Sequence, residues 1–215
     1  MKKQDDELAN SSYAQGMTDN PTPRAESTRL AIITTAERLF REMGYQKTAV
    51  ADIARELRMS PANIYRFFPS KAAINEAIAE RLLGGLSEQA WGIARGRGPA
   101  DARIRQFFSM LQEQTIALFF KEKRMHDMVG AAMAENWEAI DRFIGDIDTA
   151  LRHIVMDGQA AGLFDRALDA DATGRLIHAT MLGFCHPTII EQCADDDLPA
   201  LAAGMAEFAL RALRP

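Results

Sequence analysis

The sequence predicts an all-α protein with about nine helices: an N-terminal three-helix head that contains a helix-turn-helix, followed by a helical bundle. Two observations predict this class. From Ser27 onward, apolar residues recur every three to four positions, which is the period of an amphipathic helix. No stretch shows the alternation of apolar and polar residues that is typical of a strand. We therefore divide the 215 residues into a disordered tail (1–23), a helix-turn-helix domain (24–71) and a helical domain (72–215).

The first predicted helix has one apolar face and ends at Gly44, because glycine is common just past a helix C-terminus. We expect Ser27 or Thr28 to cap its start, since a hydroxyl there accepts a backbone N–H. The apolar face is formed by Ile32, Ala36, Leu39, Phe40 and Met43.

Three more helices follow at short intervals. The second runs over about 49–57, with Thr48 as its cap. The third opens at Ser60-Pro61, which places a capping hydroxyl before a proline at the first helical position. Residues 68–70 end this helix and cap a fourth, which runs from 71 to about 92.

A loop at 96–99, rich in glycine and closed by proline, separates this fourth helix from the bundle. Apolar stripes then predict the remaining helices. A further helix is predicted at 173–184, and His186-Pro187 ends it. The stripes are Ile104, Phe107, Phe108, Leu111, Thr115 and Leu118; then Ile140, Ile144, Ile147, Leu151 and Ile154; and last Leu198, Leu201, Met205, Phe208 and Ala212.

Charge is distributed unevenly along the chain, whose net charge is -5. The segment 24–71 holds nine Lys and Arg against five Asp and Glu, whereas 72–215 holds 14 against 21. A basic N-terminal module therefore precedes an acidic body, and a polyanion would be attracted to one end only. Lys2 and Lys3 leave open that the tail is an arm that reaches DNA, but acidic residues follow them.

The second and third helices have the apolar and small residues that a DNA-binding helix-turn-helix needs. Ala54 allows a close crossing, and Ile64 and Phe68 turn one face of the third helix toward the core. On the other face, Arg66 is suited to a guanine edge and Asn63 to an adenine edge. The predicted DNA contacts are Tyr45, Thr48, Arg58, Ser60, Pro61, Ala62, Asn63, Tyr65, Arg66 and Lys71.

Short patterns of this kind also occur in all-α proteins that do not bind DNA. A resemblance favours DNA binding for this pattern, because residues 28–75 closely resemble the DNA-binding head of the tetracycline-repressor (TetR) family. The matching text is Ile33-x-x-Ala36-x-x-Leu39-Phe40-x-x-x-Gly44-Tyr45, Thr48-x-Val50-x-Asp52-Ile53-Ala54 and Ser60-Pro61-x-x-Ile64-Tyr65-x-Phe67-Phe68-x-Ser70-Lys71. The resemblance implies a sequence-specific transcriptional regulator, more often a repressor than an activator, and not an enzyme.

One position departs from the family pattern. Arg58 stands where the turn of the family usually has glycine, and a non-glycine residue in a left-handed turn costs roughly 1–2 kcal/mol. Ala62 replaces a common glycine of the recognition helix, which favours the helix. We expect Arg66→Ala to relax sequence preference and Lys71→Ala to weaken binding to all DNA about equally.

The resemblance further implies a homodimer built from the last two helices, a palindromic operator, and a small-molecule effector in the body, with no cofactor or metal. Ala202, Ala203, Gly204 and Ala206 permit close helix approach, although this helix could simply cover its own core. Any single candidate pocket residue is more often plain core than a ligand contact. The candidates are Phe107, Leu111, Met128, Met133, Trp137, Phe143, Ile147 and Met181.

Three rival functions remain at this point. Cys185-His186 with Cys193 suggests a thiol or metal site, but adjacency in sequence supplies no oriented base, and the spacing does not fit metal ligands. A DNA-packaging protein would need a basic surface throughout, which the acidic body contradicts. A helical interaction protein would not need Tyr65, Arg66 and Lys71.

The tail has no apolar core of a signal peptide, and no apolar run approaches the ~20 residues of a membrane span. We therefore expect free thiols, no membrane contact and a cytoplasmic location.

Overall fold

The computed structural model describes residues 22–119, 138–186, 189–190 and 197–215, and their regular structure is entirely helical. The predicted all-α class is confirmed, with eight helices in this part of the chain against about nine predicted. They are α1 (Pro23–Met43), α2 (Val50–Glu56), α3 (Pro61–Tyr65), α4 (Lys71–Ala94), α5 (Ala100–Phe119), α7 (Glu138–Ala160), α8 (Ala170–Cys185) and α10 (Leu198–Ala212).

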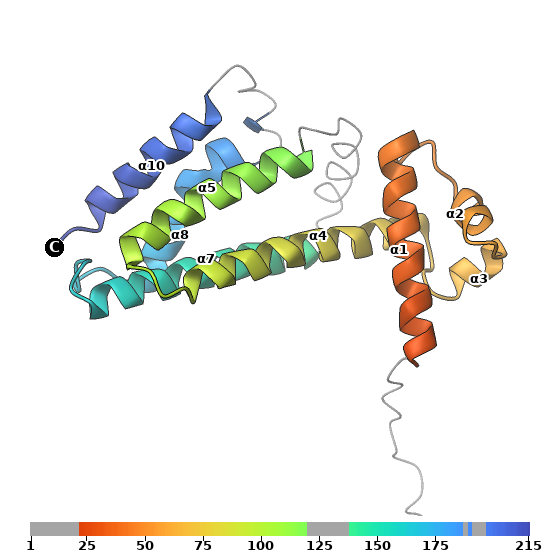
Figure 1. Ribbon diagram of the computed structural model, residues 1–215, viewed down its shortest axis with the longest axis horizontal. Helices are drawn as coiled ribbons and strands as arrows, with labels where there is room; N and C mark the ends of the chain where they lie inside the picture. Colours follow the sequence, from red (N-terminus) through yellow and green to blue (C-terminus); the bar gives the residue numbers. More distant parts are fainter. Residues whose placement is uncertain (1–21, 120–137, 187–188, 191–196) are drawn as a thin grey trace, which may run out of the picture.

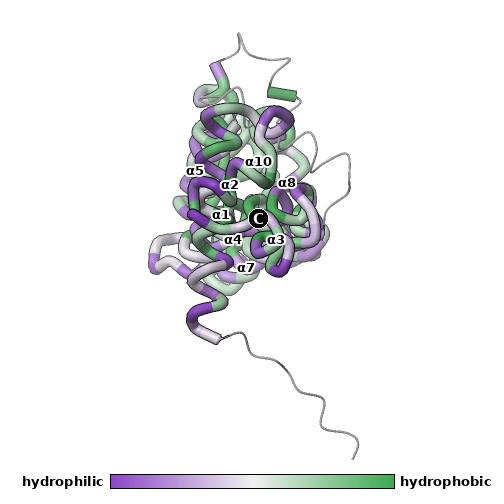
Figure 2. The backbone as a smooth tube through the Cα atoms, turned by 90° about the vertical axis from the view of Figure 1, so that its right-hand side faces the viewer, coloured by the Kyte–Doolittle hydropathy of each residue, from purple (hydrophilic) through white to green (hydrophobic). Residues whose placement is uncertain are grey.

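The molecule has a head and a body that are joined by one long helix (Figure 1). Helices α1, α2 and α3 form the head at one end, and α5, α7, α8 and α10 form the body. Helix α4 begins in the head and runs along α7 into the body. Figure 2 shows that polar and apolar residues mix along these helices, as expected for elements with one buried face.

Two separate apolar cores hold these parts together, and α4 contributes to both. Its first turns place Ile74, Ala77 and Ile78 in the head core, whereas Ala90 and Ala94 belong to the body core. The head core therefore extends beyond residue 71, where we placed the domain boundary. One helix thus belongs to both cores.

The start of α1 differs from the prediction. The helix begins at Pro23, and the hydroxyl oxygen of Thr22 accepts the amide of Ala25, so neither Ser27 nor Thr28 is the cap. Apolar periodicity missed this first turn because its residues are exposed. The helix thus includes the last residue of the segment 1–23 that was predicted as a tail, and residues 1–21 lie outside the described residues. Gly44, with φ 95°, ends α1 as predicted.

The ends of the next helices confirm most of the predicted caps. Ser60 caps α3 and Ser70 caps α4, each through its side-chain oxygen. Thr48 is not the cap of α2, because Ala49 occupies that position. The Asp52 carboxylate accepts the amide of Ala49 at 2.9 Å, and this hydrogen bond holds the pKa of Asp52 below its usual value.

Arg58 adopts the left-handed conformation, with φ 55°, that its position in the family pattern implies. The amide of Arg58 donates to the carbonyl of Arg55, and the amide of Met59 donates to that of Ala54. These two bonds form the Schellman arrangement that ends many helices, usually with glycine at the left-handed residue. Met59 packs against the head core, which secures the turn despite the unfavourable backbone of Arg58.

Replacing Arg58 by glycine should stabilise the head. The strain of a left-handed arginine is roughly 1–2 kcal/mol, and glycine loses about 0.5–1 kcal/mol more chain entropy on folding, which leaves a gain of up to about 1.5 kcal/mol. Urea unfolding followed by circular dichroism measures this change. The matched control is Arg55→Gly, three residues earlier in the helix, which should lose about 1 kcal/mol. A loss of stability in Arg58→Gly would show that the arginine side chain compensates for its backbone.

Candidate DNA-binding interface

The third helix has one buried and one exposed face. Ile64 is fully buried and Phe68, just past the helix, is 2% exposed, so these two side chains anchor α3 in the head core. The opposite face carries Tyr65 and Arg66, both exposed, with Tyr65 51% accessible although it is aromatic. Pro61 and Ala62 are exposed at its start and Asn63 is half-buried. Helix α3 thus has the buried face and the exposed face that the sequence predicted.

Helix α2 lies against α3 and fixes its position. Ile53 is fully buried and Ala54 is 1% exposed, so α2 turns these two residues toward the head core. The hydroxyl oxygen of Ser60 accepts the amide of Asn63 at 3.2 Å, and Pro61 follows at the first helical position. Both features pre-order the first turn of α3, so its exposed side chains project from a defined backbone.

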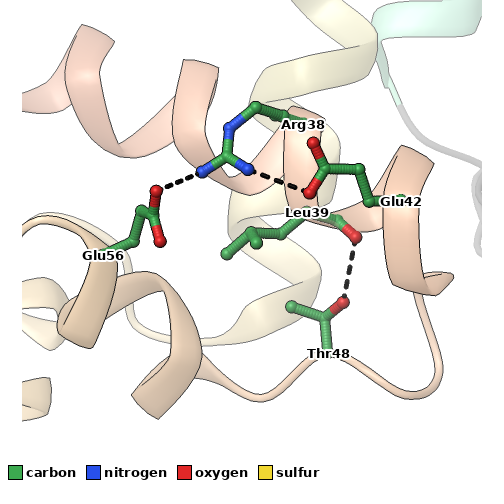
Figure 3. A network of polar contacts seen from close by, with 5 residues as sticks. All are labelled: Arg38, Leu39, Glu42, Thr48 and Glu56. Carbon is green, nitrogen blue, oxygen red and sulfur yellow. Dashed lines mark hydrogen bonds and ion pairs between the residues drawn. The ribbon is translucent and has the colours of Figure 1, made fainter.

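An ion-pair network joins the first two helices (Figure 3). The Arg38 guanidinium on α1 donates to Glu42 at 2.9 Å and to Glu56 on α2 at 2.6 Å. Hydrogen bonding to Glu42 and the charges of both carboxylates raise the pKa of Arg38. All three groups are exposed, so the network orients α2 rather than adding much stability.

Three predicted DNA contacts have side chains engaged inside the head. Thr48 is 1% exposed, and its hydroxyl donates to the carbonyl of Gly44 at 2.9 Å. The carbonyl of Leu39 lies 3.4 Å from the same hydroxyl (Figure 3). Tyr45 is buried, and its ring meets that of Phe40 edge-on, with centroids 5.2 Å apart. The hydroxyl of Thr48 is therefore committed to the loop between α1 and α2.

Lys71, the third of these residues, holds the same loop. Its ammonium group donates to the carbonyls of Tyr45 at 2.9 Å and Thr48 at 3.2 Å, and lies 4.4 Å from the centre of the Tyr45 ring. The sequence placed Lys71 at a helix start, where a cation suits a phosphate. Since its protons point to carbonyls, Lys71→Ala removes a structural tie as well as a charge.

Arg29 is a residue of the head that the sequence reasoning did not select. It lies on α1, donates from Nη1 to the carbonyl of Phe67 at 3.2 Å, and places its guanidinium 4.2 Å from the centre of the Phe68 ring. No motif reports such a contact, because 38 residues separate donor and acceptor. It joins α1 to the segment that directly follows α3.

Five of the eight candidate effector-pocket residues share one apolar cluster of the body. Phe107, Leu111, Ile147 and Met181 are at most 1% exposed and come from α5, α7 and α8. Phe143 packs against this cluster and lines a shallow groove with Glu80 and Arg142. Met128, Met133 and Trp137 lie outside the described residues. The sequence thus identified side chains that converge, and these are also core residues.

Cys185 lacks the property that a free nucleophilic thiol needs. Burial raises the pKa of this thiol to about 12, so it is protonated at neutral pH, whereas the nucleophile is the thiolate. Cys193 lies outside the described residues. Within the described part of the chain, no three His, Cys, Asp or Glu side chains gather as metal ligands. No helix in that part has the length and hydropathy to cross a membrane.

Two family models match the chain, one over the head and the start of α4 and the other over most of the body. Residues 32–78 match the model described as bacterial regulatory proteins, tetR family, and residues 100–204 match that of the tetracyclin repressor-like C-terminal domain. Both models describe the same family, and the first covers the head just described. The chain belongs to the TetR family of helix-turn-helix transcriptional regulators.

Individual relatives agree with this membership. The regulator UidR of Escherichia coli K12 is 29% identical over 119 residues, which are 55% of this chain and 57% of UidR. The match thus spans little more than half the length of that relative. A regulator from Cytophaga hutchinsonii has a TM-score of 0.72 at 18% identity, over 88% of this chain and 100% of its own.

A second solved structure is SmeT, the repressor of the Stenotrophomonas maltophilia multidrug efflux pump SmeDEF, with a TM-score of 0.64 at 19% identity over 86% of this chain and 89% of its own. SmeT has also been solved in complex with triclosan. At these identities the two solved structures show a common fold.

Proposed function

We propose that this chain represses transcription as a homodimer that binds a palindromic operator, and that a small-molecule effector releases it. The single observation that supports operator reading most directly is the exposed face of α3. Tyr65 is half exposed and Arg66 exposed on a helix whose other face is anchored by Ile64. An aromatic and an arginine that project together from a rigid helix suit the major groove.

In this proposal each exposed side chain has a distinct role. Arg66 donates two hydrogen bonds to a guanine edge, and Asn63 pairs with an adenine edge. Tyr65 contacts a phosphate or a thymine methyl group. Pro61 and Ala62 are small enough to let α3 approach the bases. Contacts to the DNA backbone come from Arg58 and from Ser60 at the start of α3.

Tyr45, Thr48 and Lys71 act differently from our first expectation. Their side chains hold the loop between α1 and α2, so we propose that they present this loop to the DNA backbone. The exposed Lys47 lies on the same loop and carries a cation that is accessible from outside. Backbone amides and Lys47 then make the phosphate contacts of this segment.

The dimer interface proposed here is the outer face of α8 and α10. Leu176 on α8 is 68% exposed and Phe208 on α10 is 64% exposed, which is unusual for large apolar side chains. Leu201, one heptad before Phe208, is exposed on the same side of α10. A twofold axis through this face would generate a four-helix contact and present two copies of α3. Half-sites about 34–36 Å apart match one turn of DNA.

We propose that the effector occupies the apolar centre of the body among Phe107, Leu111, Ile147 and Met181. Their convergence from three helices supports this location. Residue Phe143 and the nearby ion pair between Arg142 and Glu80 connect α7 to α4. The triclosan complex of SmeT is an example of a small molecule bound by this fold.

Coupling between effector and operator would pass through α4. Two adjacent residues of α4 pair with different helices. Glu80 pairs with Arg142 of α7, and Arg81 pairs with Glu37 of α1. A change in the packing of α7 therefore reaches the head through two adjacent side chains. An effector that favours a different α4 position shifts the population toward dimers whose α3 helices no longer match the operator spacing.

The test of this function is selection of bound fragments from the source genome, followed by footprinting of the enriched sequence. We expect one palindromic site with half-sites about ten base pairs apart and an affinity that falls steeply with salt. A promoter fusion then distinguishes repression from activation. Failure to enrich any sequence, or an affinity indifferent to salt, would contradict the proposal.

A further inference from the structure

The amides just past the recognition helix donate to one carbonyl of that helix, so these bonds do not connect the segment to the rest of the head. Helix α3 is only five residues long, and the amides of Phe67 and Phe68 both donate to the carbonyl of Ile64. The next residue, Pro69, has no amide proton to donate. The C-terminal end of α3, where Tyr65 and Arg66 lie, therefore depends on contacts from elsewhere in the head.

Arg29 of α1 supplies such a contact with two interactions at once. Its Nη1 donates to the carbonyl of Phe67 at 3.2 Å, and its guanidinium lies 4.2 Å from the centre of the Phe68 ring. Phe68 is 2% exposed, so the ring that Arg29 covers is fixed in the core. A charge-assisted hydrogen bond and a cation–π contact together hold the chain just past Arg66.

The same combination occurs at the other end of the helix-turn-helix. Lys71 donates to two carbonyls of the loop before α2 and lies over the ring of Tyr45. In both places a cation from a flanking helix binds a carbonyl and an aromatic ring of an irregular segment. The head thus uses two cations internally, and they are not simply part of its phosphate-binding charge.

We propose that Arg29 is a positioning residue for sequence discrimination: it fixes the C-terminal end of α3 and thereby the direction of Tyr65 and Arg66. This inference rests on the proposed reading of DNA by α3. The obvious alternative is that Arg29, an exposed arginine of a DNA-binding domain, contacts a phosphate. Losing a phosphate contact would weaken binding to all DNA, because such a contact carries no sequence information, whereas losing a positioning residue would weaken binding to the operator alone.

The experiment compares Arg29→Ala and Arg29→Lys with Arg24→Ala, an exposed arginine five residues earlier on the same helix. Affinities for the selected operator and for a scrambled duplex are measured at several salt concentrations. For Arg29→Ala we expect about five- to tenfold weaker operator binding, scrambled binding within about twofold, and an unchanged salt slope. Arg29→Lys keeps the charge and one donor, and should recover part of the loss.

Equal losses on both duplexes, with a salt slope reduced by about 0.9, would make Arg29 a phosphate contact and overturn the proposal. Binding of Arg29→Ala that equals the wild type on both duplexes would overturn it as well. If the wild-type chain selects no operator, the proposed function fails, and the positioning role is judged by a measurement that needs no DNA.

That measurement is hydrogen exchange of the Phe67 and Phe68 amides in the free protein. We expect both amides to exchange at least about threefold faster in Arg29→Ala than in Arg24→Ala, because the segment loses its tie to α1. Amides of α5 in the body serve as the internal reference and should not change, which also shows that the variant is folded. Unchanged exchange at Phe67 and Phe68 would overturn the inference.

Discussion

Replacing Arg66 by alanine should weaken operator binding by at least about thirtyfold and leave binding to unrelated DNA within about threefold. A bidentate contact to a guanine edge is worth about 1–3 kcal/mol of discrimination, and the proposed dimer makes one in each half-site, so the smallest expected loss is about 2 kcal/mol. Arg66 is exposed and only its backbone caps α3, so the substitution should leave the fold intact. Competition binding between the selected operator and a scrambled duplex measures the ratio directly.

Arg66→Lys is the matched control for the charge of this residue. Lysine keeps the attraction to phosphates but lacks the planar pair of donors, so we expect it to lose discrimination while retaining affinity for unrelated DNA. Arg66→Ala should bind two operators with the same affinity: the wild-type operator, and one in which the contacted guanine of each half-site is changed. An alanine variant that binds its operator unchanged would show that Arg66 does not read a base.

Replacing Phe208 by aspartate should convert the dimer to monomers and weaken operator binding by more than about one hundredfold. The ring of Phe208 is 64% exposed in the single chain, so its burial is expected only in a dimer. A buried and unpaired carboxylate at the centre of an apolar contact costs several kcal/mol, and a monomer binds one half-site only. Sedimentation equilibrium gives the mass, and binding to the operator gives the functional loss.

Met156→Asp is a control of the same kind on a different face. Met156 is also a half-exposed apolar side chain within a long helix, but it lies on α7, outside the proposed contact. We expect this variant to remain dimeric with unchanged operator affinity. Dimers that persist in Phe208→Asp would place the interface elsewhere on the molecule.

The two predictions separate the contributions of head and body. Arg66→Ala leaves the dimer intact and removes the reading of one base in each half-site, whereas Phe208→Asp leaves α3 intact and removes the second half-site. Salt dependence adds a further distinction, since only the monomer should lose a large number of phosphate contacts.

Several local features of the head could be predicted from the sequence because they depend on neighbouring residues. Ser60 and Ser70 cap the helices that follow them, and Gly44 ends the first helix with a positive φ. The buried face of α3, with Ile64, follows from apolar spacing alone. Arg58 has the positive φ that its position in the family pattern required.

Other features depended on contacts between distant segments. Thr48 and Lys71 were predicted to face a phosphate because each precedes or begins a helix, yet their polar atoms bind carbonyls within the head. Local spacing shows that a side chain is polar, but it does not show which unsatisfied carbonyl lies nearest after folding. The same reason explains why Arg29 was missed.

By itself, the sequence determined the helical class, most helix ends and the polar face of α3, because periodicity and caps act within one or two helical turns. Only the tertiary structure decided which cations bind carbonyls within the head, as Arg29 and Lys71 do. It also decided that α4 belongs to both cores, since a helix joins whichever apolar surfaces the rest of the chain brings to it.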